Sequence, residues 1–401
     1  MSPCQFNGDN ENQNENNEQN ENNNEIDNED NEHSAINGTE GDWEVETVAE
    51  NLQIPWDINH HHDTFYITER EGYIVEIALE NNDPERIQVE TSDPIMHVDE
   101  GGLLGMALAP NFEDSGEVFL YYTYLESEET WNKVVKAVKE DSTWVETQVL
   151  LDNIPGERIH NGGRMAIGPD NHLYITTGDA NQPHLSQENE DLAGNILRMT
   201  LEGAVPEDNP FEDSYVYSYG HRNPQGIAWN DEGQLYSSEH GPAAHDEINI
   251  IEAGKNYGWP HFIGDDKGEN IEEPLLHSAD DTWAPSGITF WNGNLLAVGL
   301  RGESLYKLNE EETTLETVFT GAGRIRDVLA VDDNIYIITN NTDGRGDPRP
   351  NDDRLLRLTP AKGHRDRDLV PLVYICLHKL FLMVTLSYRS VIYRTDKDKK
   401  I

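Results

Sequence analysis

The residues of this chain that could do chemistry gather in a few short loops. Lys and Arg together number only 28 of 401 residues, yet several arginines and histidines fall close to glycines. The loops cover residues 158–164, 220–226, 239–242, 300–302 and 324–327. Arginine binds carboxylates through paired hydrogen bonds, so arginines that converge on one point would hold a small polyanionic ligand. Each arginine alone could instead pair with one of the 77 Asp and Glu residues.

Two histidine-containing segments have different expected roles. His160 lies in a loop beside Gly162 and Gly163, and a neutral imidazole is well suited to accept a proton near neutral pH. His160 is therefore a candidate general base, the alternative being a turn histidine that faces solvent. Residues 60–62 are three consecutive histidines and resemble a metal-binding tract. We expect them to be solvent-exposed in a turn before a strand, because spaced acidic partners are lacking.

The elements that must position these loops are short strands. Six apolar and aromatic segments recur along the chain, and several follow a Gly, Asn or Asp turn. They are residues 64–68, 118–122, 172–176, 234–238, 294–298 and 334–338. Second strands are expected at residues 73–77, 195–200, 304–308 and 354–358. No helical periodicity of any length interrupts the series.

The strand series predicts an all-β fold, a six-bladed β-propeller. Six units at intervals of about 40–60 residues, each a small antiparallel sheet, are typical of propellers. Closing the ring would remove free sheet edges, and residues 43–48 could supply the outer strand of the last blade. The alternative is an irregular β-sandwich. In a propeller, the chemistry would lie where loops converge on the central channel.

Composition divides the chain into three regions. Residues 1–41 contain many Asn and acidic residues and no Lys or Arg, so we expect a disordered acidic linker that cannot bury enough apolar surface to offset chain entropy. Residues 42–361 form the predicted propeller. Residues 362–401 are basic and apolar, unlike everything before them. We expect this tail to lie outside the fold, with a membrane anchor as the alternative.

The overall charge excludes some partners. The formal net charge is −49 and the pI is near 4.4, so the chain repels phosphate backbones and anionic lipid heads. Nucleic acid is therefore not an expected partner. Carboxylates are spread over the whole central region, which suggests a protein hydrated for high salt, as in halophiles.

The two cysteines lie at the ends of the chain. Cys4 and Cys376 leave the central region without a disulfide, a cysteine metal site or a thiol nucleophile. Cys4 precedes a polar stretch and looks like the start of a mature lipoprotein whose signal is missing from this chain. We therefore expect an extracellular or cell-surface protein, with membrane contact only through a lipid anchor at Cys4.

An ordered set of motifs resembles one family over about residues 43–360. The matching segments are residues 51–56, 100–110, 158–164, 192–198, 220–226, 239–242, 256–260 and 284–287. They resemble the soluble glucose/sorbosone dehydrogenases, quinoprotein aldose sugar dehydrogenases that use pyrroloquinoline quinone (PQQ). Members of that family hold PQQ, an ortho-quinone with three carboxylates, on top of the propeller over a calcium ion.

The resemblance implies a cofactor-binding role for six residues. Arg222 and Asn223 match a pair that contacts quinone oxygens and a carboxylate. Arg301 matches a position that is commonly lysine in the family. The remaining candidates are Arg324 and Arg326, which match carboxylate-binding arginines, and His240, which would line the quinone.

The resemblance also implies a metal site and a catalytic base. Gly241 and Pro242 match residues that offer backbone carbonyls to calcium, a hard cation that takes oxygen ligands. His160 matches the base that takes the proton from the sugar's C1 hydroxyl while hydride moves to the quinone, giving a lactone. Glu100 and Trp283 match substrate-facing positions. Asp246 and Glu247 would either support the calcium or only begin the next strand.

Departures from the family pattern refine these expectations. Ile159 stands where some glucose-specific members carry an acid, which favours a broad aldose range. No Cys-x-x-Cys-His heme motif occurs, so electrons would leave to a separate acceptor. Two other functions stay open, a calcium-dependent lactonase-like hydrolase and a non-catalytic binding module. Neither of them would need the arginine set, and a binding module would not need His160.

Overall fold

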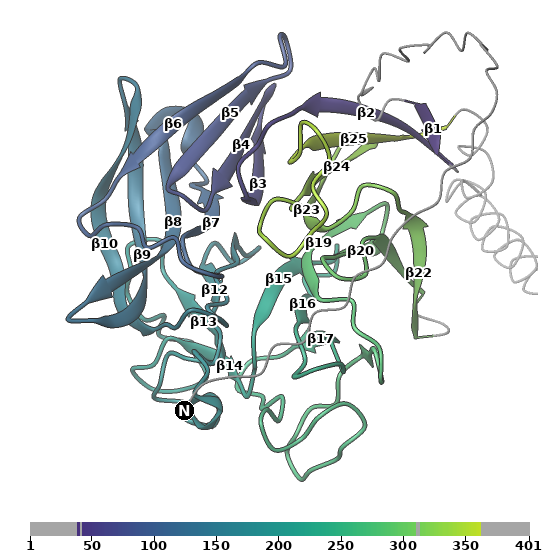
Figure 1. The fold of residues 1–401 in the computed structure, drawn as a ribbon. Coiled ribbons are helices and arrows are strands. Elements are labelled where there is room, and N and C mark those ends of the chain that lie inside the picture. Colours follow the sequence, from purple (N-terminus) through teal and green to yellow (C-terminus); the bar gives the residue numbers. More distant parts are fainter. Residues whose placement is uncertain (1–37, 41, 310–312, 362–401) are drawn as a thin grey trace, which may run out of the picture. The chain divides into compact units, whose positions relative to one another are not determined.

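The computed structural model describes residues 38–40, 42–309 and 313–361. The regular secondary structure of these residues is almost entirely β-strand (Figure 1). The described elements include one α-helix and one 3-10 helix, α1 (Phe112–Ser115) and η1 (Pro183–Gln187). Among the described residues, no helix is long and apolar enough to cross a membrane.

The strands of the described residues form five hydrogen-bonded sheets, of which the largest has eight strands. Its first four strands are β3 (Pro55–His61), β4 (Thr64–Glu69), β5 (Tyr73–Ala78) and β6 (Pro84–Glu90). Its other four are β7 (Leu103–Leu108), β8 (Glu117–Glu126), β9 (Glu129–Glu140) and β10 (Thr143–Pro155). Each group of four is antiparallel, and a short parallel pairing of β6 with β10 at Val89 and Trp144 joins the two groups.

Three sheets have four antiparallel strands each. One contains β11 (Met165–Ile167), β12 (Leu173–Thr176), β13 (Asn195–Met199) and β14 (Val216–Tyr219). The next contains β15 (Pro224–Trp229), β16 (Leu235–Glu239), β17 (Glu247–Ile251) and β18 (Leu276–His277). The third contains β19 (Pro285–Trp291), β20 (Asn294–Gly299), β21 (Leu305–Asn309) and β22 (Thr314–Phe319).

The fifth sheet joins the two ends of the described chain. It holds β23 (Ile325–Val331), β24 (Asn334–Thr339), β25 (Leu355–Pro360), β2 (Trp43–Ala49) and β1 (Gly38–Glu40). β2 pairs antiparallel with β25, so residues 43–49 complete the last sheet as the sequence predicted. This pairing closes the fold with hydrogen bonds between segments far apart in sequence.

The first strand of each four-strand unit contacts the first strand of the next unit. The contacts run from β3 through β7, β11, β15, β19 and β23 and return to β3. The sheets therefore surround a central axis, as Figure 1 shows for this view. Apolar side chains fill the spaces between neighbouring sheets, for example Leu104, Tyr121 and Ile175, because alternate residues of each strand face the next sheet.

The predicted strands are confirmed and the predicted ends lie mostly outside the described residues. All six predicted first-series segments fall in strands, namely β4, β8, β12, β16, β20 and β24. Of the predicted N-terminal linker, residues 38–40 form β1, which pairs with β2, so the strand structure begins before residue 42. The rest of that linker and the predicted tail at 362–401 lie outside the described residues.

Candidate active site

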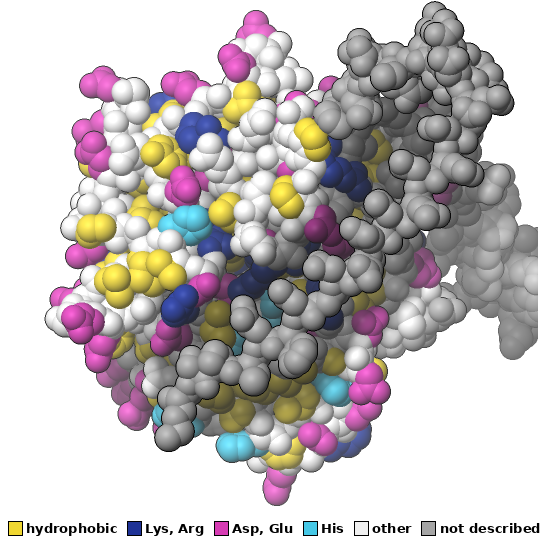
Figure 2. Space-filling model, in the orientation of Figure 1, with side chains coloured by type: hydrophobic (Ala, Val, Ile, Leu, Met, Phe, Trp, Pro, Cys, Tyr) yellow, Lys and Arg dark blue, Asp and Glu magenta, His cyan; other side chains and the backbone are white. Residues whose placement is uncertain are grey.

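One end of the central axis carries a small cavity with a charged lining. Its lining residues come from sheets far apart in sequence, at strand ends that face the same way. They are Trp56, Arg70, Glu100, Gln225, His240, Leu300, Arg326 and Arg345. Trp56, Gln225 and Arg326 lie near the starts of β3, β15 and β23, the first strands of their units. On the face drawn in Figure 2, basic side chains lie around the middle and acidic ones are densest along the outline.

The His160 imidazole is held on both ring nitrogens. Its Nδ1 lies 2.8 Å from Asp179 Oδ1, and because an ionised carboxylate only accepts, Nδ1 carries the proton. Nε2 therefore presents a lone pair, which accepts a hydrogen bond of 3.0 Å from Arg222 Nη2. The His160 backbone has a φ of 59° and donates its N–H to Glu100. Gly178 permits this path, since a Cβ there would lie 1.9 Å from the His160 carbonyl oxygen.

Asp179, which the sequence analysis missed, orients the candidate base. The carboxylate is buried and accepts from three donors: the His160 ring, the Asn181 backbone and the Trp259 indole N–H at 2.9 Å. Asp179 follows β12 by three residues, and an acid just beyond a predicted strand was the available signal. Its pairing with a histidine 19 residues earlier depends on how β11 and β12 bring their ends together.

Arg222 and Asn223, to which the resemblance gives a cofactor-binding role, lie beside the His160 loop. The Arg222 guanidinium lies 5.4 Å from the Trp259 ring centroid and donates to the His240 carbonyl, while the Arg222 backbone donates to buried Glu239. Burial lowers the pKa of Arg222, and its Nε has no partner among the described residues. Asn223 is buried and accepts from the Gly162 backbone, which connects two of the predicted loops.

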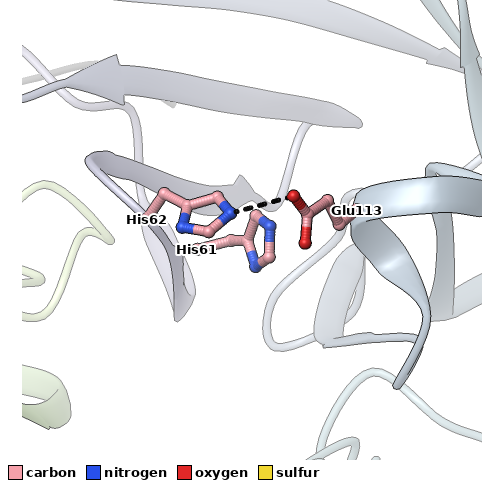
Figure 3. Close-up of side chains that lie close together, drawn as sticks. All are labelled: His61, His62 and Glu113. Atoms are coloured by element: carbon pink, nitrogen blue, oxygen red, sulfur yellow. Dashed lines mark ion pairs between the residues drawn. The ribbon is translucent and has the colours of Figure 1, made fainter.

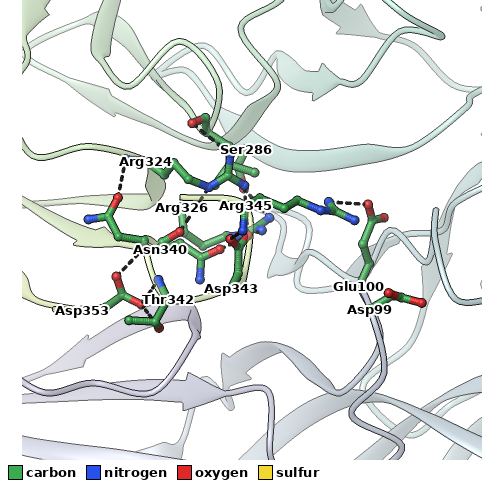
Figure 4. Close-up of polar contacts among 12 residues, drawn as sticks. Asp99, Glu100, Ser286, Arg324, Arg326, Asn340, Thr342, Asp343, Arg345 and Asp353 are labelled. Atoms are coloured by element: carbon green, nitrogen blue, oxygen red, sulfur yellow. Dashed lines mark hydrogen bonds and ion pairs between the residues drawn. The ribbon is translucent and has the colours of Figure 1, made fainter. Parts of the chain in front are cut away.

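Arg324 and Arg326 converge on Asn340 but have different partners (Figure 4). Arg324 forms an ion pair of 2.9 Å with Asp343, so its charge is already balanced. Arg326 donates to Gln225, to Asn340 and, more weakly, to a serine hydroxyl, all of which are neutral groups. Burial lowers the pKa of Arg326, as expected for a desolvated cation without a contacting carboxylate.

Glu100, a predicted substrate-facing residue, lines the cavity and is paired with Arg345, which the sequence analysis missed. Arg345 Nη1 lies 2.8 Å from Glu100 Oε1 (Figure 4). Burial alone would raise the pKa of Glu100, but the His160 amide and Arg345 outweigh it and lower the pKa to about 2. Arg70 also lines the cavity and had not been singled out. No motif marked either arginine.

His240, Gly241 and Pro242 lie together at a second small cavity, which adjoins the first through His240. Burial lowers the pKa of His240 to about 4, so the ring is neutral. Gly241 is required by its tight turn, because a Cβ would lie 2.0 Å from the Ala244 carbonyl oxygen. Its backbone N–H donates to buried Asp246, which fixes this loop.

Carboxylates next to this loop could assist in holding a hard cation. Glu239 and Glu247 are cross-strand neighbours in β16 and β17, and both line the second cavity. Removal from water and the nearby Glu239 raise the pKa of Glu247 to about 8. Calcium takes oxygen ligands, and the carboxyl groups of Glu239 and Glu247 could supply them beside the exposed Pro242. Asp246 is engaged with backbone and hydroxyl donors of residues 241 and 282–284. Glu239 already accepts from the His221 ring and from the Arg222 backbone.

Two predicted site residues do not join the cluster. Arg301 is exposed and follows the cavity-lining Leu300. Trp283 does not line either cavity; its backbone donates to Asp246 and its ring lies 6.4 Å from that of Tyr306. The substrate-facing role of Trp283 therefore stays a prediction.

The three consecutive histidines also differ from expectation. His60 and His61 end strand β3 and are half-buried, and only His62 is exposed. An acidic partner exists, because Glu113 lies 3.7 Å from His62. It was missed because it belongs to a different hairpin.

Buried side-chain nitrogens without a hydrogen-bond partner indicate the kind of ligand that the site would bind. Among the described residues, Arg222 Nε, Arg326 Nε and His240 Nε2 are buried without a hydrogen-bond partner. An unpartnered buried donor has a free-energy cost, and two of these belong to desolvated cations. The residues present therefore fit a small anionic cofactor with several oxygen acceptors.

Comparison with known proteins shows one family. The family model described as Glucose / Sorbosone dehydrogenase matches residues 52–357. The solved PQQ-bound aldose sugar dehydrogenase of Streptomyces coelicolor is 36% identical, with a TM-score of 0.73 over 79% of this chain and 98% of that one. The aldose sugar dehydrogenase of Escherichia coli is 31% identical over 61% of this chain and 76% of that protein. Quinoprotein glucose dehydrogenase B of Acinetobacter calcoaceticus is 34% identical over 42% of each chain.

Proposed function

Because this chain belongs to the glucose/sorbosone dehydrogenase family, we propose that it is a quinoprotein oxidoreductase that oxidises the C1 hydroxyl of aldoses to lactones. The observation that carries the proposal is the arrangement of His160, Asp179 and Arg222 beside a cavity with unpartnered cationic donors. A hydrolase that works with metal-bound water, or a binding module, has no use for that combination. The similarity to a PQQ-bound aldose sugar dehydrogenase supports the same reading.

The cofactors of the proposed reaction are PQQ and calcium. Arg222, Arg326 and His240 would hold the anionic quinone, with Asn223 and Arg324 fixing the surrounding loops. Gly241 and Pro242 would offer carbonyl oxygens to calcium, with a carboxylate of Glu239 or Glu247 nearby. When bound, PQQ supplies a hydride acceptor and calcium supplies a Lewis acid that polarises it.

The protein's own contribution is a positioned base. Asp179 keeps the proton on Nδ1 of His160, so that Nε2 can accept the proton of the sugar's C1 hydroxyl. Arg222 now donates to that Nε2, and the substrate hydroxyl would replace it as the donor. The carboxylate of Asp179 also stabilises the imidazolium that forms, as an adjacent opposite charge does.

The six-bladed architecture belongs to the proposal. We count β3–β6 and β7–β10 as separate blades joined by two parallel residue pairs, because each group is an antiparallel unit and β3 and β7 take successive places around the axis. The cavity then lies at the mouth of the channel. That is where residues from all blades can reach one ligand.

Reconstitution of the apoprotein tests the proposed reaction. Purified protein would receive calcium, PQQ, an aldose and a dye acceptor, and dye reduction would be followed. Activity should require PQQ, and His160→Ala should reduce kcat by about 10²–10⁴-fold. His184→Ala, which changes an exposed histidine of η1, is the matched control. If His160→Ala keeps full activity, His160 is not the base; if bound PQQ gives no reduction with any aldose, the dehydrogenase proposal fails.

The expected substrate range is broad. Ile159 presents an apolar side chain next to His160, and an apolar contact cannot select one pattern of sugar hydroxyls. The values of kcat/KM for glucose, galactose, xylose and maltose should therefore lie within about one to two orders of magnitude of one another. A preference for one sugar beyond about 10³-fold would contradict this part of the proposal.

A further inference from the structure

A second cluster of potential metal ligands lies away from the candidate active site. The side chains are His61, His62 and Glu113, and one ligand atom from each lies within 4.8 Å of the others (Figure 3). His61 ends β3 and His62 follows it in the β3–β4 turn, while Glu113 belongs to α1 between β7 and β8. Three ligands from two neighbouring four-strand units therefore meet at one point.

The local backbone explains why two consecutive histidines share one side. Successive side chains of a strand point to opposite faces, so a regular strand would separate His61 from His62. His62 instead has a φ of 51°, in the left-handed region. Its ring lies with its centroid 4.1 Å from that of His61, and its Nε2 lies 3.7 Å from Glu113 Oε1. A non-glycine residue enters that region at some energetic cost. Here this backbone conformation brings the His61 and His62 imidazoles side by side.

The His61 ring is well supported on its apolar side. It packs edge-on against Phe112, with centroids 5.2 Å apart, and Phe112 also packs against Tyr66. Its Nε2 is buried, and no hydrogen-bond partner for it occurs among the described residues. An imidazole nitrogen without a partner, beside a second imidazole and a carboxylate, is a donor set for a transition metal.

We propose that His61, His62 and Glu113 bind a divalent transition metal ion of the zinc class. Ligand atoms around a tetrahedral zinc lie about 3.3 Å apart, given bonds of about 2.0–2.1 Å. His62 and Glu113 are exposed, so small side-chain rotations can close the present spacing. Two imidazoles favour zinc, nickel or copper over calcium. A fourth position stays open for water.

The position of this site assigns it a structural role. Most of β3 separates it from the cavity, because Trp56 is the second residue of the strand and His61 is its last. At about 3.3 Å per residue this is a separation of more than 15 Å. The metal would join the β3–β4 hairpin to α1 and so connect two adjacent units at the end of the axis opposite the candidate active site.

Titration with Zn²⁺ alone tests the proposal. The full chain, treated with chelator and then saturated with calcium, would compete for Zn²⁺ with a chromophoric chelator, and thermal unfolding would be followed in parallel. The His61→Gln/His62→Gln variant should lose one equivalent of bound zinc, or bind it at least about tenfold more weakly. Zn²⁺ should raise the Tm of the natural protein more than that of the variant. Co²⁺ in place of Zn²⁺ should give a visible absorption band that the variant lacks.

His184→Gln is the matched control, because His184 is exposed and lies outside the cluster. It should bind zinc as the natural protein does. Dye reduction by the reconstituted double variant should stay normal, which shows that the variant is folded. Equal zinc stoichiometry and affinity in the natural protein and the double variant would overturn the proposal, as would a tight site lost only in His184→Gln.

Discussion

His160 illustrates how one residue acquires a function from its neighbours. A histidine in a loop could simply face solvent. Here Asp179 fixes the tautomer by accepting from Nδ1, and Arg222 donates to the lone pair of Nε2. The ring thus has an acceptor nitrogen aimed at a cationic group that also borders the proposed quinone site. The same nitrogen can accept a substrate proton only while Asp179 keeps the other one protonated.

Replacing Asp179 by Asn should impair catalysis more than binding. The amide of Asn could donate to Nδ1, which would move the ring proton to Nε2 and remove the base. We expect kcat to fall by about 10²–10⁴-fold, with a small change in KM, measured by dye reduction with saturating PQQ. Trp259→Phe removes only one donor to Asp179 and should have a smaller effect. An unchanged kcat in Asp179→Asn would show that the tautomer does not matter.

Replacing Arg326 by Gln should weaken cofactor binding. Arg326 is a buried cation with neutral partners and an unpartnered Nε, so an anionic ligand would gain a charge-assisted hydrogen bond from it. We expect the half-saturating PQQ concentration to rise at least about tenfold, equivalent to about 1.4 kcal/mol. Arg301→Gln changes an exposed guanidinium and should matter less. A larger increase in the half-saturating PQQ concentration for Arg301→Gln than for Arg326→Gln would contradict the conclusion that the buried Arg326, and not the exposed Arg301, binds the cofactor.

At the scale of elements, the loop after β16 depends on one carboxylate. Asp246 Oδ1 accepts from the Gly241 backbone, and Oδ2 accepts from the Thr282 hydroxyl and two backbone amides of residues 283 and 284. The proposed calcium loop and the segment before β19 are therefore held by the same buried group. This role explains why Asp246 itself is unsuited to be a metal ligand.

Asp246→Ala should destabilise the protein strongly. Four donors would lose their acceptor in a buried region, and each unsatisfied group costs about 1–3 kcal/mol. We expect the free energy of unfolding, measured by urea denaturation, to fall by at least about 3 kcal/mol. Asp231→Ala removes an exposed acid and should stay within about 0.5 kcal/mol of the natural protein. A loss below about 1 kcal/mol at Asp246 would contradict the described contacts.

Strands were more predictable than the contacts among loops. Apolar, β-branched and aromatic runs with turn residues between them predicted β4, β8, β12, β16, β20 and β24. Periodicity reports burial within one segment, so it could not reveal the parallel pairing of β6 with β10. Likewise, Asp179 and Arg345 act through partners that only the tertiary structure brings near.

At the scale of the whole molecule, the channel contains a buried charge cluster. Arg164 lies 2.8 Å from Asp57 and 2.7 Å from Asp327. Asp57 belongs to β3 and Asp327 to β23, while Arg164 directly precedes β11. Burial raises the pKa of Asp57 from 3.8 to about 7, partly opposed by Arg164 and reinforced by Asp327. Burial raises the pKa of Asp327 as well. Among the described residues, Arg164 is the one cation that pairs with both carboxyl groups. The folded protein therefore keeps a proton on this pair at pH values at which both acids of the unfolded chain would be ionised.

This cluster gives a signed pH dependence. Because folded Asp57 binds its proton more tightly than the unfolded chain does, its stabilising contribution is present below about pH 4 and is lost as the pH rises to about 7. Asp57→Asn replaces the acid by a neutral amide that does not titrate. The variant should therefore lack the decrease in the free energy of unfolding that is due to Asp57. The free energy of unfolding of the natural protein relative to the variant should therefore decrease between pH 4 and pH 7. A relative stability that increases over this interval would show that Asp57 ionises readily when folded.

The net charge of −49 makes the whole molecule sensitive to salt. Repulsion among surface carboxylates opposes the compact state, and it is screened as the Debye length falls from about 10 Å at 0.1 M to about 3 Å at 1 M salt. We expect calorimetric Tm to rise steeply between 0.1 and 1 M KCl and little thereafter. Stabilisation by exclusion of solutes from the surface would instead continue to grow with concentration, as a parallel series in sucrose should show. A Tm that stays constant or falls up to 1 M KCl would contradict this prediction. It would mean that repulsion among the carboxylates does not lower the stability of the folded state, because local ion pairs such as those of Arg164 and Arg324 already compensate the negative charge.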